Sequence, residues 1–193
     1  MNLARHTDIS EEPRPAELTL DDFRVLHEAE AFENRRKVEL IEGVLFEVAP
    51  QQVRHARFKS RLAVALAQAL QEAACPLEVL IEPTVAMLPK SAPEPDIAIV
   101  SDQEGDDYVA LSTVALLIEI SSTTFRFDSG EKAALYARNN VPEYWIFDLQ
   151  RGRAVILTEP RPDGFRARNE FEIGGRLSSI TIDGLSVDTA NLI

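Results

Sequence analysis

The sequence predicts a mixed α/β domain in which a central β-sheet is flanked by helices, with an N-terminal β-hairpin and a C-terminal β extension. Two almost continuously apolar runs, PDIAIV at 95–100 and VALLIEIS at 114–121, are typical of central strands that are buried on both faces. Residues 55–74 repeat apolar side chains at helical spacing. Strands and helices that alternate in this way favour a sheet covered by helices.

The bulk properties are those of one soluble, globular domain. The chain has 193 residues, of which 45% are hydrophobic and 27% charged. Residues 1–16 are polar, so we expect a flexible arm there and a single domain over 17–193. No apolar run reaches the ~20 residues of a membrane span, and the N-terminus lacks the apolar core of a signal peptide. Cys75, the only cysteine, cannot form an internal disulfide, and together these features favour a cytoplasmic protein without membrane association.

The net charge of −12 counts against a nucleic-acid enzyme, because phosphate binding favours basic surfaces. Cations in a metal site would offset only part of this charge. We therefore expect weak or partner-dependent binding of nucleic acid, or a basic patch hidden within the average.

Boundary signals place the other elements in the first half of the chain. They predict a short helix with acids in its first turn at 18–30, a β-hairpin around Glu42-Gly43 at 37–50, and strands at 77–88, 95–100 and 114–121. Pro76 stops the 55–74 helix. A polar, acidic connection at 101–112 joins the last two strands.

In the second half of the chain, the sequence pattern predicts a helix followed by further strands. Asp128 and Glu131 have the spacing of a capping box, which places a helix start near 128–130. After that helix the pattern predicts a buried strand at 144–149 with Trp145 in the core, two strands around a Pro-Asp-Gly turn at 153–175, and an irregular segment at the edge of the sheet at 177–193.

Two acids interrupt the apolar strands. Asp96 opens one run and Glu119 lies inside the other. A carboxylate buried in such a run is costly unless a metal ion, a lysine or a proton offsets its charge. One such acid alone favours a strand end that reaches solvent, or a structural ion pair. Two of them on neighbouring strands favour a shared divalent cation, because Mg²⁺ is usually held by carboxylates.

Lys132 follows the Glu119 strand and lies in the next predicted helix. From there its amine can point back toward the acids, orient an attacking water and offset phosphate charge. An ordinary solvated lysine is the alternative. A metal ion at such a site can generate hydroxide and stabilise charge on a transferring phosphoryl group.

The chain resembles a large family of predicted restriction endonucleases, formerly a domain of unknown function and common in cyanobacteria, in the strings VELIEGVLFEVAP, HARFKSRLAVAL, PEPDIAIV, LLIEISS and FDSGEKAALYARNNVPEYWIFDL. The resemblance covers roughly residues 35–160, and the combination is more specific than any single string. The family belongs to the PD-(D/E)xK nuclease superfamily. The resemblance therefore implies a restriction-endonuclease-like fold.

The resemblance also implies roles for individual residues. Pro95-Asp96 matches the PD element and Glu119 matches the second acid. Asp96, Glu119 and the main-chain carbonyl of Ile120 would then hold Mg²⁺ or Mn²⁺. The superfamily's usual lysine, two residues after the second acid, is replaced by Ser121. The resemblance places the catalytic lysine on the following helix instead, at Lys132.

Three further residues match the family in supporting positions. Glu39 lies in the N-terminal hairpin and His55 opens the first long helix, and either would support the metal ligands or be a distal ligand. Tyr136, one turn after Lys132, would support the lysine. The alternatives are an exposed strand acid for Glu39, helix capping or packing for His55, and a core position for Tyr136.

The sequence therefore predicts a metal-dependent endonuclease that hydrolyses phosphodiester bonds of nucleic acid, DNA in the first place, with water as the nucleophile. The resemblance also implies a homodimer. Two alternatives stay open: a catalytically silent nuclease-fold module for binding or interaction, and a nuclease subunit that needs a partner for DNA recognition. No glycine-rich phosphate loop, Cys/His zinc cluster or nucleophile elbow is present in the sequence, which disfavours other hydrolase classes.

Overall fold

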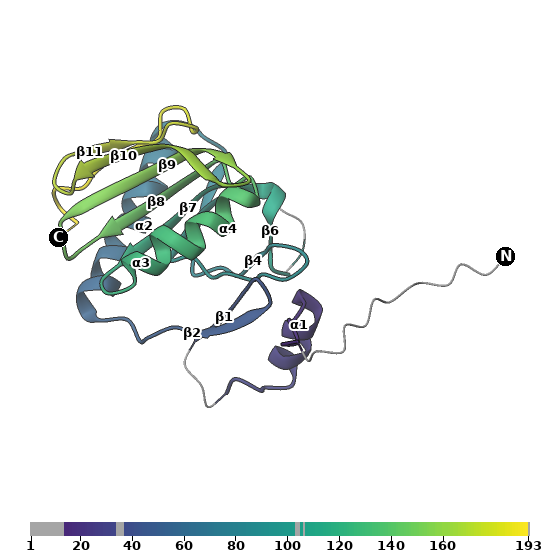
Figure 1. The fold of residues 1–193 in the computed structure, drawn as a ribbon. Helices are drawn as coiled ribbons and strands as arrows, with labels where there is room; N and C mark the ends of the chain where they lie inside the picture. Colours follow the sequence, from purple (N-terminus) through teal and green to yellow (C-terminus); the bar gives the residue numbers. More distant parts are fainter. Residues whose placement is uncertain (1–13, 34–36, 103–104, 106, 193) are drawn as a thin grey trace.

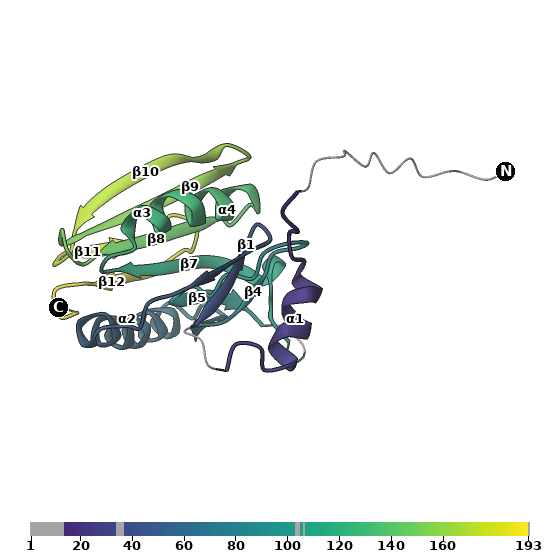
Figure 2. The same ribbon diagram turned by 60° about the horizontal axis from the view of Figure 1, so that its bottom comes forward.

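A long helix, a six-stranded mixed sheet and a second helical stretch form three layers in the computed structural model (Figure 1), which describes residues 14–33, 37–102, 105 and 107–192. A small unit made of helix α1 and hairpin β1–β2 packs at one side (Figure 2). This architecture confirms the predicted mixed sheet flanked by helices. The predicted flexible arm at 1–16 falls largely outside the described residues, and the division into an arm and a single domain stays a prediction. None of the helices in the described ranges is both long and apolar enough to cross a membrane.

The elements have the following bounds. The helices are α1 (Leu20–Glu28), α2 (Val53–Glu72), α3 (Phe125–Phe127) and α4 (Ala133–Arg138), with a 3-10 turn at Leu111–Thr113 and a π-helical turn at Asp128–Lys132. The strands are β1 (Val38–Ile41), β2 (Val44–Glu47), β3 (Leu77–Ile81), β4 (Val85–Ala86), β5 (Ile97–Ser101), β6 (Val109–Ala110), β7 (Val114–Ser121), β8 (Glu143–Asp148), β9 (Arg153–Arg161), β10 (Gly164–Glu172), β11 (Arg176–Ser178) and β12 (Ser186–Asp188).

The central sheet has the strand order β10-β9-β8-β7-β5-β3. Strands β7 and β8 pair in parallel, and the other neighbours pair antiparallel. The two apolar runs of the sequence are neighbours, with Ile97 of β5 opposite Ile118 of β7. Both strands are buried along most of their length because α2 covers one face, while the helical stretch 125–138 and residues of β1, β4 and β6 cover the other, which explains their apolar composition.

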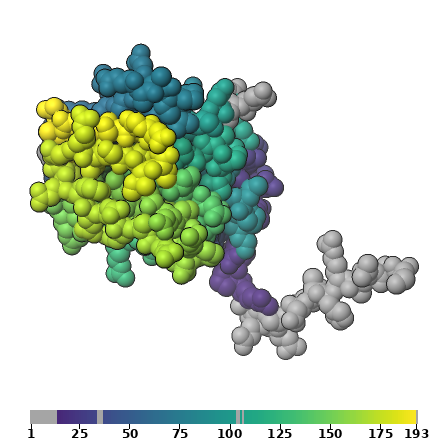
Figure 3. Space-filling model, turned by 90° about the horizontal axis from the view of Figure 1, so that it is seen from above, coloured from purple at the N-terminus to yellow at the C-terminus, as the bar shows by residue number. Residues whose placement is uncertain are grey.

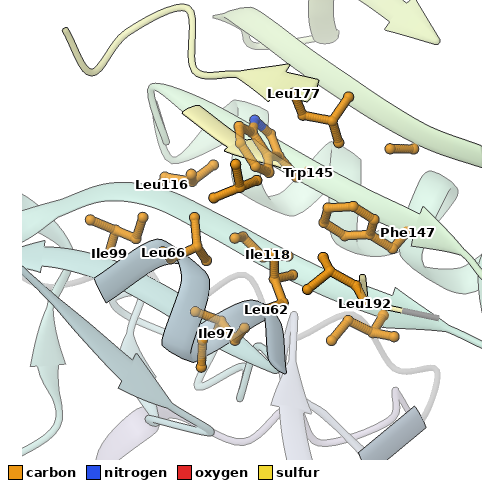
Figure 4. Packing of buried hydrophobic residues seen from close by; sticks show 14 of the residues in the cluster. Leu62, Leu66, Ile97, Ile99, Leu116, Ile118, Trp145, Phe147, Leu177 and Leu192 are labelled. Carbon is orange, nitrogen blue, oxygen red and sulfur yellow. The ribbon is translucent and has the colours of Figure 1, made fainter. Parts of the chain in front are cut away.

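Helix α2 covers one face of the sheet and forms a large core cluster with it. Leu62 and Leu66 of α2 pack in this cluster with Ile97, Ile118 and Trp145 (Figure 4). Trp145 is fully buried, which confirms its predicted core position. Full burial of a large apolar side chain stabilises the fold by roughly 1.5–3 kcal/mol.

The C-terminal segment packs on this same face, so the predicted place of 177–193 at the edge of the sheet is wrong for the residues that the structure describes. The irregular course predicted for it is right apart from two short strands. The segment forms the antiparallel pair β11–β12 and places Leu177, Leu185 and Val187 in the core beside α2. Figure 3 shows this segment in yellow, lying against α2 in blue. Each strand has only three residues, which is too short for an alternating pattern to reveal the pairing in the sequence.

A buried carboxylate, Glu143 of β8, attaches the C-terminal segment to the sheet. It accepts hydrogen bonds from the Trp145 indole N–H at 2.6 Å and from the Ser179 and Thr181 hydroxyls, each at 2.7 Å. The main-chain amides of Ile180 and Thr181 also donate to it. These donors offset the cost of burying the charge and hold the loop before β12 against β8.

The helical stretch 125–138 covers the other face and begins earlier than the sequence predicts. The predicted helix start near 128–130 is wrong, because α3 begins at Phe125 and Asp128 lies inside the stretch. The buried carboxylate of Asp128 accepts hydrogen bonds from the hydroxyls of Ser121 and Thr124. A side chain that would suit a helix cap here ties the helix to the end of β7 instead.

Helix α1 and the hairpin form a third core cluster, with Phe23 fully buried at its centre. Thr19 caps α1, as its hydroxyl accepts from the Asp22 N–H and the Asp22 carboxylate accepts from the Thr19 N–H. The hairpin turns at the predicted Glu42-Gly43, where φ is 50° and 79°. Positive φ at both central residues is typical of a two-residue hairpin turn.

The strand predicted at 77–88 is divided in two by a turn. β3 ends at Ile81, Glu82 has a φ of 53°, and β4 pairs with β6, which lies inside the polar, acidic connection at 101–112. The Glu82 N–H donates to the carbonyl of Asp96 at 3.1 Å. The turn therefore brings an acid next to the start of β5.

We expect Gly43→Ala to destabilise the protein more than Gly152→Ala. Both glycines have a positive φ, so alanine adds about 1–2 kcal/mol of backbone strain at either position. A Cβ at Gly43 would also lie 2.7 Å from the Cβ of Glu17, whereas a Cβ at Gly152 meets nothing within 4 Å. The free energies of unfolding in urea should therefore differ by a further 1–3 kcal/mol, roughly the cost of overpacking. Equal losses would contradict the close approach at Gly43.

Candidate active site

The pairing of β5 with β7 brings Asp96 and Glu119 together. Because Ile97 lies opposite Ile118, Asp96 at the start of β5 is level with Glu119. Their side chains are 8% and 7% exposed and line one cavity of about 360 Å³, which Lys132 also lines. The structure thus gathers the three residues of the predicted centre around one hollow.

Donors hold both carboxylate oxygens of Asp96. Oδ2 accepts the main-chain N–H of Ile120 at 2.8 Å, and Oδ1 lies 2.8 Å from Nε2 of His55 and 3.4 Å from Nζ of Lys59. Burial alone would raise the pKa of Asp96, but the hydrogen bond and charge of His55, with the other donors, outweigh it and lower this pKa. Asp96 is therefore an anion at neutral pH.

Lys59 lies one turn after His55 on α2 and is buried beside Asp96. Its Nζ lies 2.6 Å from the Glu82 carboxylate and 2.6 Å from the side-chain oxygen of Gln51. The sequence places Lys59 on the same helix face as His55, but it gives no signal for Glu82 or Gln51. Both reach the site from irregular chain, the turn after β3 and the loop before α2, whose course has no periodicity to read.

Lys132 lies between two buried carboxylates. Its Nζ is 2.8 Å from Oε1 of Glu119 and 2.8 Å from Oε2 of Glu39. The hydroxyl of Tyr136, one turn further along, donates to the same Glu119 oxygen at 3.1 Å. The structure thus brings both Glu39 and Tyr136 to the lysine, and Glu39 is buried rather than exposed on its strand.

One lysine for two buried carboxylates leaves negative charge in excess. Oε2 of Glu39 accepts no hydrogen bond within the part of the chain that the structure describes, although the ammonium lies close by. Burial, together with the neighbouring carboxylates, raises the pKa of Glu119 to about 8 against the opposing charge of Lys132. Burial lowers the pKa of Lys132, but these carboxylates outweigh it and raise that pKa well above its usual value. A further cation or a proton would offset the excess.

Ser121 occupies the position of the superfamily's usual lysine, on the same face of β7 as Glu119. It is fully buried, and its hydroxyl donates to Asp128 at 2.5 Å. Its side chain is therefore engaged in the bond that ties the helical stretch to β7. The amine that reaches Glu119 comes from Lys132 instead.

Comparison with known proteins shows which family this chain belongs to. A family model described as "Uma2: Putative restriction endonuclease" matches residues 20–190. The chain belongs to this family. A solved structure described as "a putative nuclease belonging to DUF820 from Anabaena variabilis" resembles the Uma2 chain with a TM-score of 0.68 and 15% identity, covering 91% of this chain and 97% of that one. A comparison with curated proteins gives no match. Family membership confirms the predicted family and supports a nuclease role, and the solved structure supports the fold.

The donor set of the Uma2 chain suits a hard divalent cation. Asp96 and Glu119 offer carboxylate oxygens, and a cation beside them would take the place of the proton that Glu119 holds at its raised pKa. Within residues 14–33, 37–102, 105 and 107–192, no group of three or more His, Cys, Asp or Glu side chains is arranged to hold a metal ion. Main-chain oxygen, water and substrate phosphate would have to complete the coordination, as they commonly do for Mg²⁺.

We expect the stability of the metal-free protein to fall as the pH rises from 4.5 to about 8, because of Glu119. The pKa of this carboxyl is about 8 in the folded protein and near the ordinary 4.5 in the unfolded chain, so the folded state binds more protons in this range. The free energy of unfolding therefore decreases with rising pH, by at most about 1.4 kcal/mol per pH unit.

Urea unfolding at several pH values, in the presence of a chelator, measures this slope. The glutamine of Glu119→Gln cannot titrate, so this variant should lack the fall in unfolding free energy that Glu119 causes. Glu78→Gln changes an exposed acid on β3 and should keep the wild-type slope. A wild-type slope in Glu119→Gln would show that Glu119 ionises at its ordinary pKa.

Proposed function

We propose that this Uma2 protein hydrolyses phosphodiester bonds of DNA with a divalent cation, Mg²⁺ or Mn²⁺, held by Asp96 and Glu119. The observation that carries the proposal is that Asp96, Glu119 and Lys132 line one cavity, in which the buried carboxyl groups of Glu119 and Glu39 share a single lysine. A purely structural ion pair needs one carboxylate for each lysine, whereas the second carboxyl group here needs a proton or a cation beside it, because an uncompensated buried charge is strongly destabilising.

In this proposal Asp96, Glu119 and the main-chain carbonyl of Ile120 hold the cation. When bound, it supplies a hydroxide at neutral pH and stabilises the charge of the transferring phosphoryl group. The Ile120 amide donates to Asp96, so the side chain and the strand that carry these ligands are fixed relative to each other. His55 and Lys59 act as positioning residues, because both contact the other oxygen of Asp96.

Lys132 orients the attacking water and offsets the phosphate charge. Its ammonium has three N–H donors and contacts two carboxylates, which leaves a donor for a water or phosphate oxygen. Glu39 and Glu119 hold the amine at the cavity wall, and Tyr136 fixes the shared oxygen of Glu119. Burial strengthens the attraction between this ammonium and an entering phosphate, since solvent screens it weakly.

The resemblance to the family extends the proposal to DNA as the substrate and to a homodimer, and the single cysteine adds a cytoplasmic setting. The net charge of −12 favours one second candidate, a nuclease subunit that takes its DNA recognition from a partner. The two candidates share the same centre and differ in whether the isolated protein cleaves DNA.

Purified protein should cleave DNA with Mn²⁺ or Mg²⁺ and lose this activity in a chelator. Asp96→Asn and Glu119→Gln keep the side-chain shapes but remove the charges that hold the cation. We expect each to lower kcat/KM by at least about 10²–10³-fold, the effect of removing one electrostatic group from an active site. Cleavage of plasmid and single-stranded DNA, followed on gels, measures this, and Glu78→Gln should retain wild-type activity.

Calorimetric titration with Mn²⁺ separates metal binding from the chemical step. The wild-type protein should bind the ion, and Asp96→Asn and Glu119→Gln should lose this binding. The proposal fails if the wild type cleaves no form of DNA or RNA faster than the variants and binds no ion that they lose. Metal binding without cleavage would favour the partner-dependent nuclease.

Lys132→Met should lower both stability and cleavage. It leaves two buried carboxylates without their cation, which costs about 3–5 kcal/mol of unfolding free energy. The double variant Glu39→Gln/Lys132→Met removes one of those charges and should recover part of the stability, measured in urea. Cleavage should stay low in the double variant. Recovery of wild-type cleavage there would show that Lys132 has only a structural role.

A further inference from the structure

Most of helix α2 carries positive charge without any acid. From Val53 to Gln71 it contains three arginines, a lysine and a histidine, and its first acid is Glu72. The whole chain has a net charge of −12, so this helix is locally positive within an acidic protein. His55 and Lys59 turn inward to Asp96, whereas the arginines of this helix are exposed.

Arg54 and Arg57 come one residue before and two residues after His55 in the first two turns of α2. His55 lines the cavity itself, whereas these arginines line a second hollow of about 240 Å³ together with Leu149. Leu149 follows β8, and its N–H donates to the carbonyl of Ser121 at the end of β7. The second hollow therefore lies at the same end of the sheet as the cavity, which Ile120 and Ser122 line on either side of Ser121.

Two further arginines lie around the same end of the sheet. Arg126 is exposed on α3, between Thr124 and Phe127, which line the cavity. Arg151 lies in the turn between β8 and β9, with 66% of its side chain exposed, and contacts Asp148 at 3.5 Å. Figure 1 shows the start of α2, α3 and this turn at the same end of the molecule.

Three of these arginines have no acidic partner among the residues that the structure describes: Arg54, Arg57 and Arg126. By contrast, Arg153 and Arg168 both pair with Glu170 on the outer strands. An unpaired, exposed guanidinium is weakly hydrated and binds phosphate oxygens through two parallel N–H donors. Such groups beside a cavity lined by carboxylates suit a substrate whose charged backbone extends past the reacting bond.

We infer that an arginine rim, made of Arg54, Arg57, Arg126 and Arg151, binds the phosphate backbone of DNA next to the cleaved bond. The inference rests on the proposed function, because it takes the substrate to be nucleic acid. It also explains how an acidic chain binds DNA, since the surplus of acids elsewhere repels the duplex and the rim attracts it to this end of the sheet.

Fluorescence anisotropy with a short labelled duplex tests the rim, in a chelator so that no cleavage occurs. Each phosphate contact contributes about one unit to the slope of log affinity against log salt, so Arg54→Ala/Arg57→Ala should reduce the slope by about 2. At physiological salt we expect binding to weaken on the order of tenfold. The matched control is Arg161→Ala/Arg166→Ala, which removes two exposed arginines from the β9–β10 hairpin and should keep the wild-type slope.

A wild-type slope in Arg54→Ala/Arg57→Ala, an equal loss in the control, or no duplex binding by the wild type overturns the inference. Thermal unfolding of both double variants checks that they fold. A cleavage assay on the same proteins separates the rim from the proposed hydrolysis. Rim-dependent binding without cleavage supports the rim and rejects hydrolysis by the isolated protein, whereas wild-type cleavage by Arg54→Ala/Arg57→Ala rejects the rim alone.

Discussion

The buried ammonium of Lys132 joins parts of the fold that no shared sheet connects. It links the helical stretch 125–138 to Glu119 on the central sheet and to Glu39 on β1, whose hairpin forms a two-stranded sheet of its own. A buried ion pair adds little net stability, because both charges lose their hydration, yet breaking one is costly. The interaction therefore fixes where the hairpin lies more than it stabilises the fold. The wall of the cavity depends on that placement, since Glu39 and residues 46–48 line it.

Asp96 and Glu119 share one cavity but have opposite surroundings. Donors from two elements, α2 and β7, surround Asp96 and lower its pKa, whereas Glu119 shares one ammonium with a second carboxylate and its pKa is raised. Pairs of carboxyl groups whose surroundings separate their pKa values are typical of centres that handle protons or cations. One carboxyl is thus a permanent anion, and the charge of the other depends on which cation lies beside it.

Much of the site was predictable because burial leaves a mark on sequence. An acid inside a run such as VALLIEIS stands out, since apolar strands exclude charge unless function or pairing retains it. The burial of Glu39 left no such mark, because β1 is four residues long and its partner β2 is mostly exposed. Asp128 was misassigned for a different reason. Its spacing to Glu131 satisfies a local capping rule, and only the tertiary contact with Ser121 overrides that rule.

The π-helical turn at Asp128–Lys132 accommodates one residue more than an α-helical turn, and the N–H of Ala133 reaches back five residues to the carbonyl of Asp128. Each α-helical residue advances about 100° around the axis, so the extra residue sets the rotation of all that follows. It lets Asp128 face the end of β7 while Lys132 and Tyr136 face Glu119. The rotation of the helix about its axis therefore sets the direction in which the Lys132 amine points. A chain shortened by one residue in this turn would keep every side chain of the cavity and still aim its lysine elsewhere.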